Sequence, residues 1–265
     1  GVDPLQQYLV EFPGGRLQCL TVSWDTRRNR WFHLYPDERI LPEDPLHWTG
    51  RYQNWNLMCA ECHTTNLRKN YDLETDTYAT EFDEINVGCQ ACHGPGQAHL
   101  EWAEQQEQAP ENEGGSYGLL VDYSGNDSKY QVDACAPCHS RRARIKDSWR
   151  HFGPFLDQFR PETLIPRLYY ADGQILDEVY VYGSFLQSKM YEKGVRCTNC
   201  HDPHSTKLWV SENAVCTQCH QLQPMEGFPT LLQKDYDTPD HHFHPEGSEG
   251  AQCVNCHMPE RTYMV

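Results

Sequence analysis

The sequence has no long apolar runs, no basic surplus and fewer apolar residues than usual. No apolar run approaches the about 18 residues of a membrane-spanning helix, so we expect no membrane span. Lys and Arg number 22 against 38 Asp and Glu, and the formal charge of −16 excludes nucleic acid as an expected partner. Apolar residues make up only 38% of the chain, so a core built from side chains alone would be thin.

Cysteine followed by histidine is what the sequence has in excess. Among 13 Cys and 14 His, the pattern Cys-x-x-Cys-His occurs six times. It is typical of covalent c-type haem attachment, because two thiols add to the two vinyl groups on one porphyrin edge while the next residue presents its imidazole to the iron. We therefore predict six haem c groups, attached through Cys59 and Cys62, Cys89 and Cys92, Cys135 and Cys138, Cys197 and Cys200, Cys216 and Cys219, and Cys253 and Cys256. The predicted proximal iron ligands are His63, His93, His139, His201, His220 and His257.

Zinc and disulfides are the competing interpretations of these cysteines. Zinc ribbons also use paired Cys-x-x-Cys units, but zinc does not require His directly after the second Cys. Six such coincidences are not expected by chance in a chain with 14 His among 265 residues. Disulfides across two intervening residues would brace little of a fold this large. The pattern therefore favours haem.

Six porphyrins would supply the apolar mass that the side chains lack. A compact chain of this length has a radius of gyration of about 18 Å, so six macrocycles inside it must lie close together. We predict a multihaem cytochrome c fold of short helices and irregular loops around a haem stack, with the haems forming a conducting chain.

Four segments are expected within one compact, haem-organised domain. Residues 1–54 carry no haem motif and alternate in polarity between turn residues, which predicts an antiparallel β meander. Residues 55–150 hold the first three motifs, with a short helix expected to begin at Pro95 before an exposed polar run. Residues 151–194 predict a β hairpin near 168–182 and a helix over 184–193 that ends at Gly194. Residues 195–265 hold the last three motifs.

Eight further histidines could complete six irons. His204 follows His201 by three residues and can point only at a neighbouring haem, which we expect to be the one bound by Cys216 and Cys219. The same argument applies to His99, six residues after His93. At most one or two residues of the His241, His242 and His244 group are expected to be ligands, because adjacent side chains diverge. The predicted distal ligands are His99, His204, His151, His47, His33 and His244, which leaves His241 and His242 as the two surplus histidines.

Two further expectations concern the thirteenth cysteine and the cellular location of the protein. Cys19 is expected to pack as a small apolar residue, with a functional thiol as the alternative. Haem is attached to exported proteins, so we expect a periplasmic or extracellular location. Residues 1–4 lack a signal peptide, which predicts a mature, trimmed or internal piece. The acidic charge predicts redox partner proteins with a basic docking surface.

Several runs of residues resemble the multihaem cytochrome superfamily, which includes pentahaem and octahaem nitrite reductases, hydroxylamine oxidoreductase and tetrahaem electron carriers. They are the residues 55–59, Cys-His-Gly-Pro-Gly at 92–96, the run 183–191, Cys-His-Asp-Pro-His at 200–204 and Cys-His-Met-Pro at 256–259. Nearly the whole chain is similar to exported multihaem cytochromes that are often fused to helical repeats. That resemblance implies further haem motifs beyond both ends of the chain.

The sequence lacks two features that are linked to catalysis in members of the superfamily. No motif has Lys in place of His, and no Tyr can be assigned as a haem crosslink, so the resemblance supports the haem arrangement more than catalysis. We predict electron transfer through closely packed, mostly bis-histidine haems, with no catalytic residue. The alternatives are an oxidoreductase acting on a small nitrogen or sulfur compound at one five-coordinate haem, and a subunit that assembles into an oligomer or an extracellular cytochrome filament.

Overall fold

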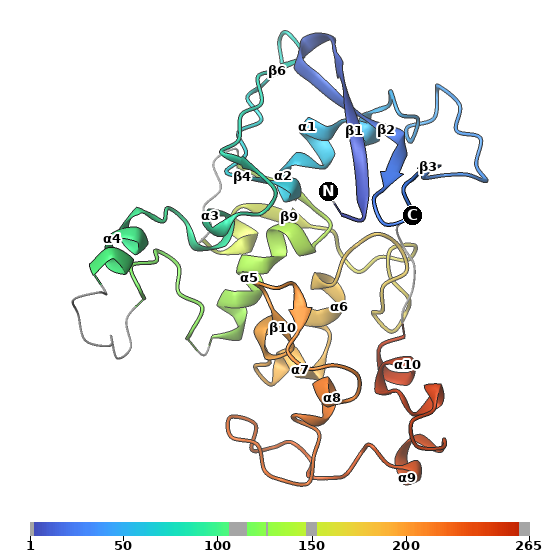
Figure 1. Cartoon of the computed structure of the whole chain (residues 1–265), viewed down its shortest axis with the longest axis vertical. Helices are drawn as coiled ribbons and strands as arrows, with labels where there is room; N and C mark the ends of the chain where they lie inside the picture. Colours follow the sequence, from blue (N-terminus) through green and yellow to red (C-terminus); the bar gives the residue numbers. More distant parts are fainter. Residues whose placement is uncertain (1–2, 106–115, 126, 147–152, 260–265) are drawn as a thin grey trace. The chain divides into compact units, whose positions relative to one another are not determined.

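The computed structural model describes residues 3–105, 116–125, 127–146 and 153–259 (Figure 1). Within these residues the chain forms two compact units. The first contains most of residues 1–162, and the second contains residues 127–132 and most of residues 163–264. The first three haem motifs lie in the first unit and the last three in the second. The division after residue 162 falls inside the segment 151–194 that separates the two groups of motifs in the sequence.

A three-stranded antiparallel sheet opens the first unit and confirms the predicted meander. Its order is β1 (Leu5–Phe12), β2 (Arg16–Asp25) and β3 (Arg30–His33), and β1 and β2 form the long blue hairpin in Figure 1. The first turn is the 3-10 helix η1 (Pro13–Gly15). Gly15 has φ 71°, and a Cβ there would meet the carbonyl oxygen of Tyr78. Only glycine therefore fits this turn.

The first haem motif is anchored to this sheet. Helices α1 (Trp55–Met58) and α2 (Ala60–His63) follow the 3-10 helix η2 (Arg51–Gln53). The Asn54 side chain accepts a hydrogen bond from the Leu57 N–H at 2.9 Å and caps α1. Cys19 of β2 packs with a buried group formed by Trp55, Ala60 and Leu67. The prediction that Cys19 packs as a small apolar residue is thus confirmed.

Asn56 joins α1 to the first turn of the sheet, so its replacement should destabilise the first unit. Its side chain accepts from Leu17 N–H at 2.8 Å and donates to Gly15 O and to Thr80 Oγ1. Asn56 is itself buried, and an Asn56→Ala change would remove its hydrogen bonds to these three groups, so we expect the free energy of unfolding to fall by about 1–3 kcal/mol. Denaturant unfolding of the holoprotein measures the change. The exposed Glu104→Ala variant is the control, and equal stability of the two variants would contradict this role.

The rest of the first unit consists of short elements. Three further two-stranded antiparallel sheets pair β4 with β7, β5 with β6, and β8 with β9. The helix predicted after Pro95 is confirmed and begins at Gln97. The elements are β4 (Thr64–Thr65), β5 (Tyr71–Asp72), β6 (Thr77–Tyr78), β7 (Glu84–Ile85), α3 (Cys89–His93), α4 (Gln97–Gln105), α5 (Ser128–His139), β8 (Arg142–Arg144), η3 (Phe155–Asp157) and β9 (Phe159–Pro161).

The second unit is equally irregular. A small buried group of Leu168, Tyr169 and Val179 packs against Ile175. One two-stranded antiparallel sheet pairs β10 with β11. The elements are α6 (Tyr182–Leu186), α7 (Lys189–Glu192), η4 (Cys197–Asn199), β10 (His201–Asp202), β11 (Lys207–Leu208), α8 (Ala214–Thr217), α9 (Pro239–His242), η5 (Glu249–Ala251) and α10 (Cys253–His257). No helix in the described part of the chain is long and apolar enough to cross a membrane.

Two elements predicted between the haem groups differ from the structure. The hairpin near 168–182 is reduced to a turn closed by Tyr170 N–H donating to Gln174 O and a single bridge between Tyr169 and Ile175. Tyr180 has φ 60°, which ends any extended run before residue 182. The single helix predicted over 184–193 is wrong. Ser188 is extended and its side chain caps α7, so two short helices form.

Candidate haem-binding sites

The six Cys-x-x-Cys-His motifs all begin in a turn of helix. They lie at α2, at α3, in the last turn of α5, at η4, at α8 and at α10. Residues three and four apart share one face of a helical turn. In the α-helical motifs the two thiols and the following imidazole therefore face the same side, as attachment to one porphyrin edge requires, whereas His201 of the fourth motif lies in β10. None of the 13 Cys, all of which lie in the described residues, forms a disulfide.

Thiols from different motifs meet within each unit. In the first unit, a hydrogen bond from the Cys138 thiol lowers the pKa of Cys62 to about 7, against the opposing effect of burial. In the second unit the thiols of Cys216 and Cys253 lie close enough to perturb each other's pKa, while burial raises the pKa of both. The structure thus brings the first motif beside the third and the fifth beside the sixth.

The imidazole of the second motif is oriented by the backbone. His93 Nδ1 donates to the carbonyl of buried Val121 at 3.0 Å. The Tyr123 ring packs edge-on against His93 at 5.4 Å, and its hydroxyl donates to Cys92 O at 2.7 Å. A proton fixed on Nδ1 leaves the Nε2 lone pair for a metal. This arrangement suits a haem-iron ligand.

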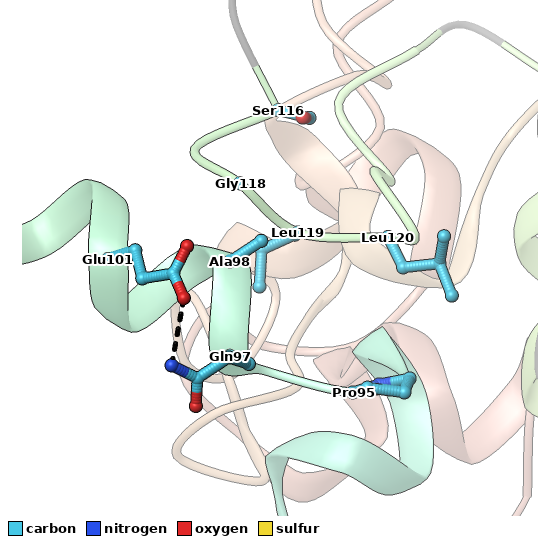
Figure 2. A pocket seen from close by; sticks show the side chains of 8 residues that line it. All are labelled: Pro95, Gln97, Ala98, Glu101, Ser116, Gly118, Leu119 and Leu120. Atoms are coloured by element: carbon cyan, nitrogen blue, oxygen red, sulfur yellow. Dashed lines mark hydrogen bonds between the residues drawn. The ribbon is translucent and has the colours of Figure 1, made fainter.

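His99 is held in the same tautomer six residues later. Its Nδ1 donates to Tyr117 O at 2.6 Å, and its ring stacks on Trp102 at 5.4 Å. The start of α4 and the segment 116–120 line a shallow, open pocket of about 470 Å³. Figure 2 shows the lining residues, which are Pro95, Gln97, Ala98, Glu101, Ser116, Gly118, Leu119 and Leu120. The Nε2 lone pair of His99 is thus left for a metal, and its role as a distal ligand stays a prediction.

His241 and His257 form a pair that the sequence did not reveal. Their ring centres are 6.1 Å apart and their planes differ by 2°. Tyr236 packs edge-on against both His241, at 5.1 Å, and His220 of the fifth motif, at 5.6 Å. His241 is absent from the ligands predicted from sequence, because nothing in the run of neighbouring histidines distinguishes it.

Three other histidines use Nδ1 as an acceptor. Tyr35 N–H donates to His33, Thr49 N–H to His47, and His244 N–H to His242. In a neutral ring this places the proton on Nε2, which then has no lone pair for iron. The roles predicted for His33 and His47 stay predictions, and this geometry does not favour them.

The remaining predicted ligands are placed as follows. His204 has a side chain that is 82% exposed, with Nδ1 3.9 Å from an Asp202 oxygen. The His244 ring lies against Gly250, where a Cβ would collide with it. His151 lies outside the described residues. Burial lowers the pKa of His63, a predicted proximal ligand, and this favours its neutral, metal-binding form.

A buried charge cluster lies beside the first motif and was also missed from sequence. Glu61 contacts Arg142 Nη1 at 3.1 Å, Arg144 Nε at 3.2 Å and Lys69 Nζ at 3.5 Å. We call these four residues the Glu61 cluster. Burial lowers the pKa of Lys69, against the effect of Glu61. No sequence motif joins positions so far apart in the chain.

Comparison with known proteins supports the haem interpretation. The family model described as "Cytochrome c554 and c-prime" matches residues 43–94, which contain the first two motifs. A curated relative, the dissimilatory sulfite reductase MccA of Wolinella succinogenes, is 28% identical over 198 residues, which are 65% of this chain and 22% of the relative. The chain thus spans about a fifth of the length of that protein.

Two solved structures are similar. The outer cell wall cytochrome OcwA matches with a TM-score of 0.58 and 17% identity, over 83% of this chain and 53% of its own. An undecahaem cytochrome from the S-layer of Carboxydothermus ferrireducens matches with a TM-score of 0.42 and 18% identity, over 97% of this chain and 44% of its own. The likeness to OcwA shows a shared fold.

Proposed function

We propose that this chain, which is a multihaem c-type cytochrome, carries single electrons along six haem c groups whose irons are mostly bound by two histidines. The observation that carries the proposal is the pair of parallel imidazoles of His241 and His257. An iron bound on both faces has no open position for a substrate, so it exchanges electrons without exchanging ligands.

The spacing of this pair fits two axial ligands of one iron. Imidazole nitrogens bind first-row metals at about 2 Å, so two rings on opposite faces of one haem have centres about 6 Å apart. The observed 6.1 Å agrees with that value, whereas directly stacked rings would lie closer together. His257 belongs to the sixth motif, so His241 is proposed as its distal ligand.

The donor set of the chain fits haem at the other motifs as well. Each pair of Cys would hold the porphyrin by thioethers, and each following His would bind the iron, with His93 fixed by Val121. When bound, the haem supplies an iron that cycles between the ferric and ferrous states. His99, held by Tyr117, is proposed as a distal ligand to a haem other than the one attached at Cys89 and Cys92.

The meeting thiols support an electron path that departs from chain order at the first and third haems. Because Cys62 lies beside Cys138 and Cys216 beside Cys253, the attached haem edges would approach each other at these points. Electrons would pass between the first and third haems and between the fifth and sixth. An exported location and basic redox partners complete the proposal, in keeping with the charge of −16.

One observation favours a second candidate function. The relative at 28% identity is a dissimilatory sulfite reductase, so the chain could be part of an oxidoreductase for a small sulfur compound. Such an enzyme needs an open iron with cations beside it. The two candidates make opposite predictions for ligand binding.

Exogenous ligands should therefore bind the native protein slowly. Cyanide or sulfite must displace an imidazole that the fold holds in place, while dithionite should reduce all haems rapidly through their exposed edges. Absorption spectra of the native protein, with cyanide, sulfite or dithionite added separately, measure both processes. Rapid stoichiometric cyanide binding to one haem, with repeated turnover of sulfite, would establish the enzyme instead.

A further inference from the structure

The side chain of Asn213 joins the fifth haem motif to the sixth within the second unit. Asn213 directly precedes α8, the helix that carries Cys216. Its Oδ1 accepts the Cys253 N–H at 2.8 Å, and its Nδ2 donates to Ala251 O at 2.9 Å and to Asp237 Oδ1 at 2.7 Å. Both amide hydrogens and the amide oxygen are thus engaged. One half-buried amide therefore fixes three distant segments against each other.

The bond to Cys253 sets the start of the helix of the sixth motif. The first N–H groups of a helix have no partner within it, and Cys253 is the first residue of α10. Asn213 supplies an acceptor for that N–H from the start of α8. The position of α10 therefore depends on that of α8, which agrees with the closeness of the Cys216 and Cys253 thiols.

The bond to Asp237 holds an aromatic ring that lies between proposed iron ligands. Asp237 directly follows Tyr236 in the chain. The Tyr236 ring is nearly perpendicular to that of His220, at 5.6 Å, and to that of His241, at 5.1 Å. Edge-on pairs of rings at such distances attract each other. One ring thus contacts a proposed ligand of the fifth haem and a proposed ligand of the sixth.

We propose that Asn213 is a positioning residue for electron transfer between the fifth and sixth haems, because it fixes α10 and the segment of Tyr236 against the fifth motif. This inference rests on the proposed electron-transfer function. One electron leaves the ferrous iron of one haem and reduces the ferric iron of the other, and no bond forms or breaks and no proton moves. The rate of such a step depends on how closely the two partners are held.

The test follows electron exchange in the holoprotein after a laser flash, with a photoreduced flavin as the electron donor. One kinetic phase should be absent both when the two Cys of the fifth motif are replaced by Ala and when those of the sixth are. This phase belongs to exchange between the two haems. Asn213→Ala should slow it by about tenfold, since a displacement of about 1 Å is enough for such a loss. Gln223→Ala, at an exposed amide of the same unit, should leave it unchanged.

A reciprocal exchange of side chains separates positioning from a change of charge. Asn213→Asp alone places two carboxylates side by side and should slow the phase. Asn213→Asp combined with Asp237→Asn again pairs an amide with a carboxylate, keeps the net charge and still accepts the Cys253 N–H. This double variant should recover most of the rate. An unchanged rate in Asn213→Ala, or equal slowing in the single and double variants, would overturn the proposal.

The Tyr236 ring provides a second test that serves if the Asn213 variants fail to fold. Tyr236→Leu should slow the phase, whereas Tyr236→Phe keeps the ring and should not. Electron paramagnetic resonance of the ferric protein should show a changed low-spin signal in Tyr236→Leu, because the signal depends on the angle between the two imidazole planes on one iron. An unchanged rate or signal in Tyr236→Leu would overturn the proposal. Failure of dithionite to reduce the unaltered protein would instead refute the proposed function.

Discussion

Replacing both Cys197 and Cys200 by Ala is expected to remove one porphyrin of six from the mass of the denatured protein. These thiols form the only proposed covalent bonds to the fourth haem, and the remaining His201 cannot hold a porphyrin after unfolding. Intact mass spectrometry of denatured chains counts the porphyrins directly. The same change should remove one sixth of the haem absorbance per chain.

Cys19 provides the matched control for this loss. Its sulfur lies 3.9 Å from Cys59 Sγ and its side chain is buried, but it belongs to no haem motif. Cys19→Ala should therefore leave six porphyrins on the chain. Retention of six porphyrins after the double replacement would contradict the haem interpretation. So would a native mass of the unaltered protein that shows bound zinc and free thiols in place of porphyrins.

Replacing His241 by Ala is expected to convert one low-spin haem into a high-spin haem that binds cyanide rapidly. The parallel ring of His257 would lose the only proposed partner on the opposite face of its iron. Electron paramagnetic resonance and absorption spectra measure the spin state, and stopped-flow mixing measures the cyanide rate. We expect one new high-spin centre per chain.

His242 tests whether the effect is specific to one side chain. It is the neighbour of His241 on α9, but its Nδ1 accepts the His244 N–H and leaves no lone pair at Nε2 in the neutral ring. His242→Ala should keep all haems low-spin. The assignment is wrong if His242→Ala creates the high-spin centre while His241→Ala does not.

Local patterns carried most of what the sequence could predict. The haem motifs lie in turns of helix, because the spacing that suits a porphyrin edge also suits one face of a helical turn. The meander follows from the alternation of apolar and polar residues between two turns. The first turn is Pro13-Gly14-Gly15, and in the second, at 25–29, Asp25 accepts the N–H groups of Arg27 and Arg28. These features depend on neighbouring residues alone.

Features set by distant residues could not be predicted in the same way. His241 and His242 are identical and adjacent in sequence, and only the position of His257 distinguishes them. The Glu61 cluster unites positions 61, 69, 142 and 144, which no spacing rule connects. The helix predicted over 184–193 divides because Ser188 caps a new helix instead of continuing the first. A Ser in a helical pattern fits both outcomes.

The small buried groups of side chains have a consequence for how this molecule withstands unfolding. The apolar group around Cys19 and Trp55 and that around Tyr169 and Val179 each contain only a few residues, so short stretches of chain can open at modest cost. A cofactor held only by its iron ligands would be lost to solvent during such openings. The proposed thioether bonds would keep each porphyrin tethered to its own motif. Local opening in this protein should therefore be reversible, and refolding requires no renewed uptake of haem.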